Sequence, residues 1–573
     1  MSLIENLKKL FNIFDIDIVS ITPLIFLFLI SGGIDLLGLS LIAPYISFLI
    51  EGNDSIFIEK VRSLDFLKDL DIKELIIFLS LIIFIIFFFK FIFALLIRFL
   101  IAKFSFNCRR KLQIKLLKSY QEMEYKFFNL KGSNEFIKNV RELSADCTIT
   151  LDSGLKILSE SIILVSIFIY LVIMNPLTFL TLLFVVGISF VIHNIFIKPR
   201  TIILGKKRVL ALDLIYQAVN EGLRYLKEVR VLNKEKYFQN TMNKGTEDVY
   251  LSDLKTNIIL AYPRYFFELL IVGLIIFFVI LGLGEGQISK SLLPSLGIFA
   301  VAGVRIIPSV STIAHGLIMI NYKYFAIDVI FQDLIISKKN RNGSINLIEE
   351  RYENVNEIEF RDISFKYENA KNTIFENLSL KIKKNECIGI IGGNGSGKTT
   401  LVDLLLGLLK PTSGSIYINN KLNNFNKFSH LLGYIPQEHL IVSDKIIKNI
   451  TLENEEENVD KIKLKNSLQS SNLIDFVKSL EEGLNSEIGK NGLKLSGGQY
   501  KKIAIARLFY HNREVLILDE ATNSLDEESE TIVIEELKRL RKDKTILIIS
   551  HNQKPLEICD KIYKIDNKRL RLI

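Results

Sequence analysis

The chain has 573 residues, 49% of them apolar, and a mean hydropathy of +0.30. It is too long for a single domain and too apolar for an ordinary soluble enzyme. Its net charge of +9 does not indicate a nucleic-acid partner, because the basic residues gather beside apolar runs, as in the cytoplasmic loops of membrane proteins. The four cysteines lack the spacing of a zinc site or a disulfide framework.

Residues 1–17 are expected to form an interfacial amphipathic helix, since Lys8 and Lys9 lie among apolar side chains at helical spacing. We expect no cleaved signal peptide. A membrane-spanning helix needs about twenty mostly apolar residues. By that criterion the sequence predicts six spans, at 18–49, 75–101, 156–174, 176–197, 258–284 and 291–320, the third and fourth joined by a tight hairpin at Asn175-Pro176.

Charge bias predicts the orientation of the spans. Segment 103–150 carries ten basic residues and is expected to form long helices in the cytoplasm. Segment 51–74 carries four basic and seven acidic residues and is expected outside, with a short helix between Ile56 and Leu67 that lies either against the outer leaflet or packed on protein. We therefore predict a multi-pass protein of the bacterial inner membrane, with its C-terminal half in the cytoplasm.

The predicted transmembrane domain covers 1–335, and a polar linker at 336–355 leads to an α/β domain at 356–573. Gly392–Thr399 fits G-x-x-x-x-G-K-[ST] between an apolar strand and a helix, where backbone N–H groups cradle phosphates. Lys398 would add a cationic contact and Thr399 a Mg²⁺ ligand. The expected nucleotide contacts are Gly392, Gly393, Asn394, Gly395, Ser396, Gly397, Lys398, Thr399 and Thr400.

Further candidate residues follow predicted strands. Gln437 can reach Mg²⁺ and an attacking water, while Asp519 suits the Mg²⁺ shell. The next residue, Glu520, is the candidate general base. His551 would contact the γ-phosphate; the alternative is a structural histidine. Tyr367 would stack on adenine; the alternative is a tyrosine at a sheet edge.

Leu495–Gln499 resembles the signature of ATP-binding-cassette (ABC) proteins. Together with the residues above, the resemblance covers the whole C-terminal domain and implies hydrolysis of ATP with Mg²⁺. It also implies two cassettes packed head to tail, each ATP lying between one phosphate loop and the partner's signature. The signature and turn residues then expected at ATP are Ser496, Gly497, Gly498, Gln499 and Asp526.

One cassette and one set of spans imply a half-transporter of the exporter type that pairs with a second copy of itself. By the same resemblance, coupling helices are expected near 121–130 and 219–229. The chain departs from the family pattern at two places. Tyr500-Lys501-Lys502 stands where Arg-Gln-Arg is common, and Asn523 where serine or alanine is common.

Charged residues interrupt the predicted spans, and such groups usually face a cavity or a partner. They are Asp35, Lys90, Arg98, Arg264, Glu268 and Arg305. Basic residues prevail in the second, fifth and sixth spans, so we expect a cationic cavity that suits an anionic headgroup such as a pyrophosphate. The alternatives are an i,i+4 pair of Arg264 with Glu268, and snorkelling of Lys90 and Arg98.

Segments 261–268, 305–309 and 326–332, the short external helix and the basic position at Lys90 resemble the PglK group of lipid-linked oligosaccharide flippases. This resemblance implies movement of a polyprenyl-pyrophosphate-linked glycan from the inner to the outer leaflet. Its pyrophosphate would be bound by Lys90, Arg264 and Arg305. One alternative is a general ABC exporter of lipids, drugs or peptides, and a more remote one is an ABC ATPase module without transport.

Overall fold

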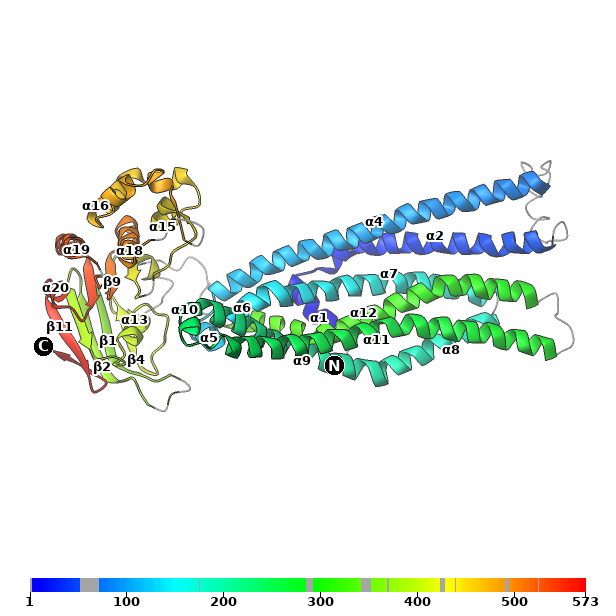
Figure 1. The fold of residues 1–573 in the computed structure, drawn as a ribbon, viewed down its shortest axis with the longest axis horizontal. Coiled ribbons are helices and arrows are strands. Elements are labelled where there is room, and N and C mark those ends of the chain that lie inside the picture. Colours follow the sequence, from blue (N-terminus) through cyan, green and yellow to red (C-terminus); the bar gives the residue numbers. More distant parts are fainter. Residues whose placement is uncertain are drawn as a thin grey trace. The chain divides into compact units, whose positions relative to one another are not determined.

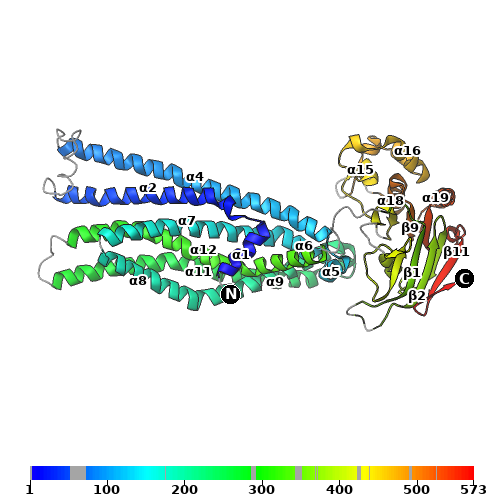
Figure 2. The same cartoon turned by 180° about the vertical axis from the view of Figure 1, so that it is seen from behind.

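The computed structural model describes residues 3–51, 72–174, 176–284, 292–341, 352–367, 370, 372–422, 428–437, 439–489, 493, 495–523 and 525–573. The chain divides into two compact units (Figures 1 and 2). Met1–Met123 and Phe127–Arg341 form a helical unit, and Glu124–Lys126 and Asn342–Ile573 form a unit with β-sheets. This arrangement confirms the predicted fold class.

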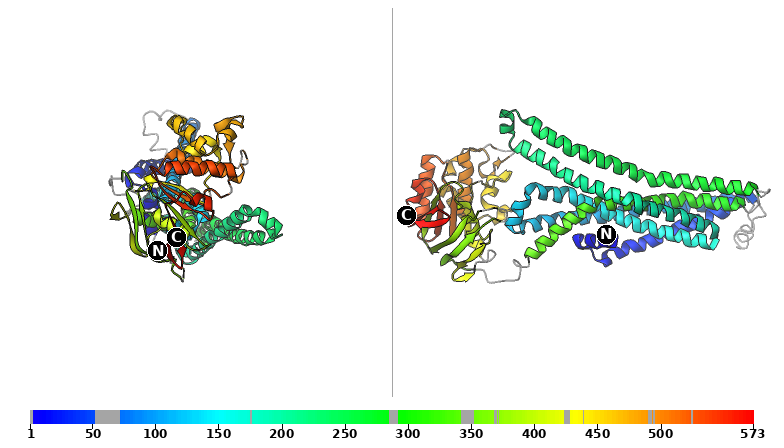
Figure 3. Two further views of the ribbon diagram at one scale, coloured as in Figure 1. Left: turned by 90° about the vertical axis from the view of Figure 1, so that its left-hand side faces the viewer. Right: turned by 90° about the horizontal axis from the view of Figure 1, so that it is seen from below.

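The helical unit combines long helices with short connecting ones. The long helices are α2 (Ile18–Glu51), α4 (Ile72–Gln121), α7 (Ser144–Met174), α8 (Pro176–Ile192), α9 (Lys198–Arg224), α11 (Glu235–Gly284) and α12 (Leu292–Arg341). The short ones are α1 (Leu3–Phe14), α5 (Tyr125–Lys131), α6 (Ser133–Lys138), α10 (Leu226–Val231) and the π-helical turns η3 (Asn139–Leu143) and η4 (His193–Ile197). Figure 3 (right) shows α9 and α11 side by side, with α10 at one end.

Several helices are longer than a membrane requires. α4, α11 and α12 have 50 residues each. At 1.5 Å per residue this is about 75 Å, whereas the hydrocarbon core is about 30 Å thick. The apolar part of each helix matches a predicted span and its charged part continues as helix. That the extensions of α4 and α11 lie in the cytoplasm stays a prediction.

Five helical stretches of the described chain are long and apolar enough to cross a membrane: Ile18–Gly38, Lys73–Gln121, Ser133–Ile173, Phe179–Arg224 and Arg305–Lys338. The predicted span at 258–284 forms the second half of α11. The predicted external helix at 56–67 and residue Asn175 lie outside the described residues, so both predictions stay predictions.

Helix α1 packs against protein, not only at a membrane surface as its amphipathic pattern predicted. Leu10, Ile13 and Phe14 are buried in a cluster that includes side chains of α4, α7 and α12. Lys9 pairs with Asp328 of α12 at 2.7 Å. Burial against protein removes apolar area from water as burial in lipid does, so an amphipathic pattern cannot distinguish the two.

The linker predicted at 336–355 stays a prediction, although its first residues are helical. α12 continues to Arg341, and 342–351 lie outside the described residues. The last turn of α12 is basic, and positive charge stabilises the C-terminal end of a helix dipole. Residues 336–341, predicted as linker because they are polar, thus belong to the end of this helix.

Helices α9 and α12 approach each other closely at Gly205. A Cβ on this residue would lie 1.8 Å from the carbonyl oxygen of Tyr322. One turn further along α9, Arg208 pairs at 2.8 Å with buried Asp146 of α7, which also accepts from Lys323 of α12 at 2.7 Å. Because a buried carboxylate is costly without partners, this network holds three helices in one register.

The second unit contains two main sheets with the strand orders β2-β1-β4-β5 and β12-β11-β3-β10-β9-β6, and a small pair β7-β8. The strands are β1 (Glu357–Phe365), β2 (Phe375–Lys383), β3 (Cys387–Gly392), β4 (Ser413–Ile418), β5 (Lys421–Leu422), β6 (Leu432–Ile435), β7 (Asp444–Lys445), β8 (Glu487–Ile488), β9 (Val515–Asp519), β10 (Thr545–Ile549), β11 (Lys561–Asp566) and β12 (Arg569–Leu572). The helices are α13 (Lys398–Leu405), α15 (Ile446–Thr451), α16 (Lys461–Ser470), α17 (Ile474–Lys478), α18 (Gly497–His511), α19 (Glu527–Leu540) and α20 (Gln553–Leu556), with 3-10 turns η5 (Ser429–Leu431), η6 (Glu456–Asn458) and η7 (Gly483–Asn485).

Strand β9 shows how the core is built. Leu516 and Leu518 pack with α18 and α19, whereas Val515 and Ile517 belong to the cluster that includes α13 and the antiparallel sheet. This alternation is the period of a strand covered on both faces.

Four neighbouring strands, β3, β10, β9 and β6, run parallel. Their carboxyl ends therefore meet at one edge of the sheet, where ligands of α/β proteins bind. The phosphate loop follows β3, Gln437 follows β6, Glu520 follows β9 and His551 follows β10.

Candidate functional site

The loop between β3 and α13 has the backbone that a phosphate-binding loop requires. Gly395 and Gly397 have φ angles of +75° and +103°, which favour glycine. A Cβ on Gly397 would also approach two neighbouring side chains within 2.8 Å. Lys398 lies back over the loop, its ammonium donating to the carbonyls of Gly392 (2.8 Å) and Gly393 (3.1 Å).

These residues fit a bound phosphate. The Ser396 hydroxyl is buried and has no hydrogen-bond partner within the described chain. The space around Gly393 and Gly395 is open, and the loop leads into the N-terminus of α13, which attracts anions. Asn394 and Thr399 are exposed. Hydroxyl and carboxylate oxygens are ligands that Mg²⁺ prefers, so Thr399 and Asp519 suit the metal of a nucleotide.

Tyr367 lies beside this loop. Its hydroxyl is 3.2 Å from the Thr400 hydroxyl, and its ring packs edge-on against Phe365 at 4.9 Å. The side chain remains 41% exposed. A sheet-edge tyrosine would be exposed as well, but the Thr400 contact adds proximity to the phosphate loop, as adenine stacking needs.

Glu520 lies at the centre of a polar cluster. Its Oε2 accepts hydrogen bonds from Gln437 Nε2 and Asn523 Nδ2, both at 3.3 Å. Its Oε1 lies 3.6 Å from Nε2 of His551. The structure thus brings the three residues predicted for catalysis together, and Asn523 joins them as a neighbour that sequence reasoning noted only as a departure from the family pattern.

The backbone of Glu520 is unusual. Its φ of +53° lies in the left-handed region, which costs an L-residue roughly 1–2 kcal/mol. The N–H donates to the carbonyl of Ile549 at 2.9 Å, and the carbonyl accepts from Lys501 Nζ at 2.9 Å. Strained residues persist where their surroundings over-determine them, and they concentrate at functional sites.

Asp519 is 6% exposed, and burial, followed by adjacent Glu520, raises the pKa of its carboxyl. Asp403 of α13 faces the same region; burial and the charge of Asp519 raise its pKa to about 6. A divalent cation held at Asp519 would favour the ionised form of both carboxyls. Sequence reasoning missed Asp403, whose only signal is a lone carboxylate in an apolar stretch of helix.

The signature residues begin helix α18. Ser496 is its N-cap: the hydroxyl oxygen accepts the Gln499 N–H at 3.2 Å, and Gln499 Oε1 accepts the Ser496 N–H at 2.8 Å. The Ser496 O–H proton stays available for a ligand. Gly497 has open space around its Cα. Among the described residues, no hydrogen bond or ion pair connects the signature to the phosphate loop of the same chain.

Asp526 caps helix α19. Its Oδ1 accepts from the Ser529 hydroxyl at 2.6 Å and from the Ser529 N–H at 2.9 Å. Lys502 lies 3.2 Å from its other oxygen. These contacts, the Ser529 hydroxyl first, lower the pKa of Asp526 to about 2. The structure therefore places the carboxylate in a helix cap, and its predicted contact with ATP stays a prediction.

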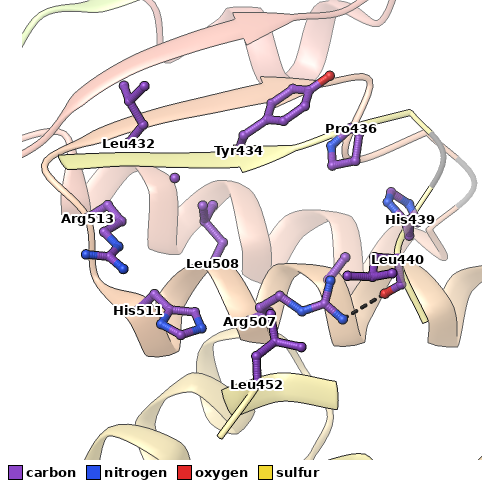
Figure 4. A pocket seen from close by; sticks show the side chains of 12 residues that line it. Leu432, Tyr434, Pro436, His439, Leu440, Leu452, Arg507, Leu508, His511 and Arg513 are labelled. Carbon is purple, nitrogen blue, oxygen red and sulfur yellow. Dashed lines mark hydrogen bonds between the residues drawn. The ribbon is translucent and has the colours of Figure 1, made fainter. Parts of the chain in front are cut away.

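A cavity of about 420 Å³ opens between β6, α18 and the segment after Gln437 (Figure 4). Arg507 crosses one wall, donating to the carbonyls of Leu440 (2.7 Å) and Asn449 (2.8 Å). Apolar side chains and His439 form much of the remaining lining, including Leu432, Pro436, Leu452 and Leu508. The cavity therefore borders both the strand that leads to Gln437 and the helix that begins with the signature.

In the helical unit, Asp35 of α2 gathers two of the predicted headgroup residues. Its carboxylate, whose side chain is 2% exposed, lies 2.5 Å from Lys90 Nζ and accepts two hydrogen bonds from Arg305, at 2.7 and 3.0 Å. Glu160 of α7 lies 3.9 Å from the same guanidinium. Two carboxylates thus balance two cations, so Lys90 and Arg305 are paired in this structure, and their contact with a substrate headgroup stays a prediction. Counting charges span by span missed Glu160.

The third predicted headgroup residue forms its ion pair elsewhere. Arg264 of α11 donates to Glu268 at 2.9 Å, one turn along the same helix. This is the i,i+4 pair that the spacing allowed as an alternative. The structure does not assemble the three basic residues around one unpaired site.

Comparisons with known proteins agree with both units. Residues 21–300 match the ABC transporter transmembrane region, and residues 375–523 match the ABC transporter domain. A solved structure of a bacterial Atm1-family ABC exporter with ATP bound superimposes with a TM-score of 0.77 over 97% of this chain and 95% of the other, at 19% identity.

Two curated relatives resemble a smaller part. ABC transporter B family member 29 of Arabidopsis thaliana, chloroplastic, is 35% identical over 221 residues, 38% of this chain and 34% of its own length. The alpha-hemolysin translocation ATP-binding protein HlyB of Escherichia coli O157:H7 is 36% identical over 217 residues, 37% of this chain and 30% of its own length. The matched part of the chain spans about a third of these relatives.

Proposed function

We propose that this chain, which matches ABC transporter families in both of its regions, is one half of an ATP-driven exporter of the bacterial inner membrane. The observation that carries this proposal is the cluster of Glu520, Gln437 and His551 at the sheet edge that also bears the phosphate loop. The relative named for alpha-hemolysin translocation supports a transport function.

The residues at this edge of the sheet would each have a different role in the hydrolysis of ATP. Glu520 would take a proton from water as the water attacks the γ-phosphate, giving ADP and phosphate. Gln437 and His551 would hold the water and the γ-phosphate oxygens. Lys398 would exchange the carbonyls it now contacts for phosphate oxygens. Mg²⁺ held by Thr399 and Asp519 would neutralise charge on the phosphates.

A direct test uses the full chain reconstituted in liposomes, with ATP hydrolysis measured as released phosphate. Glu520→Gln should lose at least about a hundredfold in kcat, since a general base contributes about 10²–10⁴. Glu535→Gln, an exposed exchange of the same kind on α19, is the matched control and should hydrolyse ATP normally. Hydrolysis by Glu520→Gln at the rate of the control would contradict the proposal.

We propose further that two copies of the chain share their ATP sites. Ser496 has a free hydroxyl proton but no contact to its own phosphate loop within the described residues, as expected if it serves the partner's nucleotide. Chains carrying Lys398→Ala and chains carrying Ser496→Ala should each be inactive alone. Mixed pairs would hold one intact site and regain part of the activity; no recovery on mixing would contradict shared sites.

Short helices occur close to the positions expected for coupling helices, α5 at Tyr125–Lys131 and α10 at Leu226–Val231. We propose that these two helices are the coupling helices of the chain.

For the transported substrate we propose the general class, an exporter of lipids, drugs or peptides. A specific observation favours it over the flippase implied by the PglK resemblance: Asp35 and Glu160 compensate Lys90 and Arg305. The narrower proposal, a flippase for polyprenyl-pyrophosphate-linked oligosaccharide, requires the headgroup to displace Asp35.

Liposomes can distinguish these substrates. A lipid-pyrophosphate oligosaccharide and a hydrophobic cationic dye are compared as substrates, with Glu520→Gln as the inactive control. ATP-dependent loss of the glycan from one leaflet, abolished by neutralising Lys90, Arg264 and Arg305, supports the flippase. Dye transport that survives the neutralisation supports the general exporter. ATP hydrolysis without movement of either substrate favours the module without transport.

A further inference from the structure

Three of the positions at which this chain departs from the ABC pattern, Lys501, Lys502 and Asn523, lie close together. Lys501 of α18 donates from its ammonium to the carbonyl of Glu520 at 2.9 Å and to the carbonyl of Asn523. Asn523 in turn donates from its side-chain amide to the Glu520 carboxylate at 3.3 Å. Lys502 pairs with Asp526 at 3.2 Å.

Lys501 holds the backbone of Glu520 where that backbone is strained. The N–H of Glu520 is fixed by the Ile549 carbonyl of β10, so the sheet determines one side of the residue. Its φ of +53° then turns the chain out of β9. After this turn, the carbonyl of Glu520 accepts hydrogen bonds from the Lys501 ammonium and, at 3.3 Å, from the Asn523 N–H.

The direction of the Glu520 side chain depends on this turn. In the extended conformation of β9 the Cα–Cβ bond would point into a face of the sheet, and the carboxylate could not reach Gln437 and His551 at once. The side-chain contacts of Glu520, at 3.3–3.6 Å, are long for hydrogen bonds and cannot by themselves impose a left-handed backbone. The charge-assisted bonds from Lys501 are stronger.

Lys501 also belongs to the helix that begins with the signature. It lies five positions, just over one turn, after the N-cap Ser496 and two positions after Gln499. A rotation or shift of the N-terminal turn of α18 therefore moves the ammonium that holds the Glu520 turn. If the signature contacts the nucleotide bound by the partner, binding of that nucleotide would change the position of Glu520 in this chain through α18 and Lys501.

We propose that Lys501 is a positioning residue for Glu520: its ammonium fixes the left-handed turn that aims the carboxylate, and helix α18 links this aim to the signature residues Ser496–Gln499. The proposal rests on the ATPase function proposed above. It does not place Lys501 in contact with ATP or water, so its loss should change the rate of the chemical step and leave nucleotide binding intact.

The test compares Lys501→Met, Lys501→Arg and Glu520→Gln in the full chain, measuring kcat and KM for ATP. Lys501→Met should lower kcat roughly ten- to a hundredfold, the effect of a misplacement of about 1 Å at a reacting group, with KM changed less than about threefold. Lys501→Arg should recover most of kcat, because a guanidinium can donate to both carbonyls. Lys465→Met, an exposed change on α16, is the matched control.

The outcomes separate this proposal from the function on which it rests. Normal hydrolysis by Glu520→Gln would overturn the proposed function itself. An inactive Glu520→Gln beside a fully active Lys501→Met would overturn only the positioning role, as would a rise in KM at unchanged kcat.

Loss of folding is distinguished by the Tm shift that ATP with Mg²⁺ induces, which Lys501→Met should retain. Asn523→Ala provides an independent variant of the same network and should lower kcat by a smaller factor, since it removes one contact to the carboxylate and leaves Lys501 in place. Full activity of Asn523→Ala together with failure of Lys501→Arg to recover kcat would also overturn the proposal.

Discussion

Replacing Asp35 by asparagine tests the ion cluster of the helical unit. The change keeps the size of the side chain and removes the charge that faces Lys90 at 2.5 Å and Arg305 at 2.7 Å. The cluster would pass from two positive and two negative charges to two positive and one negative. Breaking a buried ion pair by removing one partner costs about 3–5 kcal/mol.

The structure favours the low end of that range. The side chains of Lys90 and Arg305 remain 26% and 22% exposed, so neither cation is fully buried. Glu160 also lies 3.9 Å from the Arg305 guanidinium and can pair with it when Asp35 is replaced. We therefore expect Asp35→Asn to lower the free energy of unfolding by about 3 kcal/mol. At 2–4 °C per kcal/mol for large domains, Tm should fall by roughly 6–12 °C.

Thermal unfolding of the full chain in detergent, followed by circular dichroism at 222 nm, measures this effect. A cycle of Asp35→Asn, Arg305→Gln and the double variant isolates the pair, and the double variant should be less destabilised than the sum of the single changes. If the two changes add within about 0.5 kcal/mol, or if Asp35→Asn shifts Tm by less than about 1 °C, the cluster does not stabilise the helical unit.

Three further predictions concern single residues. Tyr367→Ala should raise KM for ATP about tenfold, because stacking on a base contributes about 1–3 kcal/mol, while Tyr367→Phe keeps KM; equal KM values in both variants would exclude stacking. Asp526→Asn should lower Tm at neutral pH through loss of charge in the helix cap. Because the folded-state pKa of Asp526 is depressed to about 2, the stabilisation by its charge is present above about pH 4 and disappears as the pH falls toward 2. The Tm values of variant and wild type should therefore converge between about pH 4 and pH 2. A constant difference in Tm would refute the assignment. Gly205→Ala should destabilise by more than about 2 kcal/mol, since its Cβ would meet the Tyr322 backbone at 1.8 Å, whereas Gly187→Ala, with nothing within 4 Å, should be neutral or stabilising in the same thermal assay.

The ATP site was largely predictable because its residues sit at the ends of strands. An apolar run followed by Asp519-Glu520 predicts both a buried strand and the position of its carboxyl end, and parallel pairing then brings such ends together. Gln437 and His551 were likewise predicted to follow strands, and the structure has both beside Glu520. Local pattern and topology were sufficient there.

The membrane half was less predictable because its polar contacts join residues far apart in the chain. Arg305 meets Asp35 across 270 positions, and no local pattern specifies that contact. Counting charges one span at a time therefore suggested an excess of cations. Lys501 was missed for a related reason, since its partners are backbone carbonyls, which carry no residue-type signal.

The Asp35 cluster also bears on how the chain is made. The first span, α2, is synthesised long before α12, so Asp35 enters the membrane without the arginine that later binds it bidentately. An aspartate at the centre of a span costs about 2.5–3.5 kcal/mol of insertion free energy, which the surrounding apolar residues must offset alone until Lys90 arrives with α4. Insertion of this protein is thereby ordered in time: the first helix must tolerate an uncompensated charge, and the last helix completes its neutralisation. Variants with a less apolar α2 should consequently fail during biogenesis even where the finished fold would accept them.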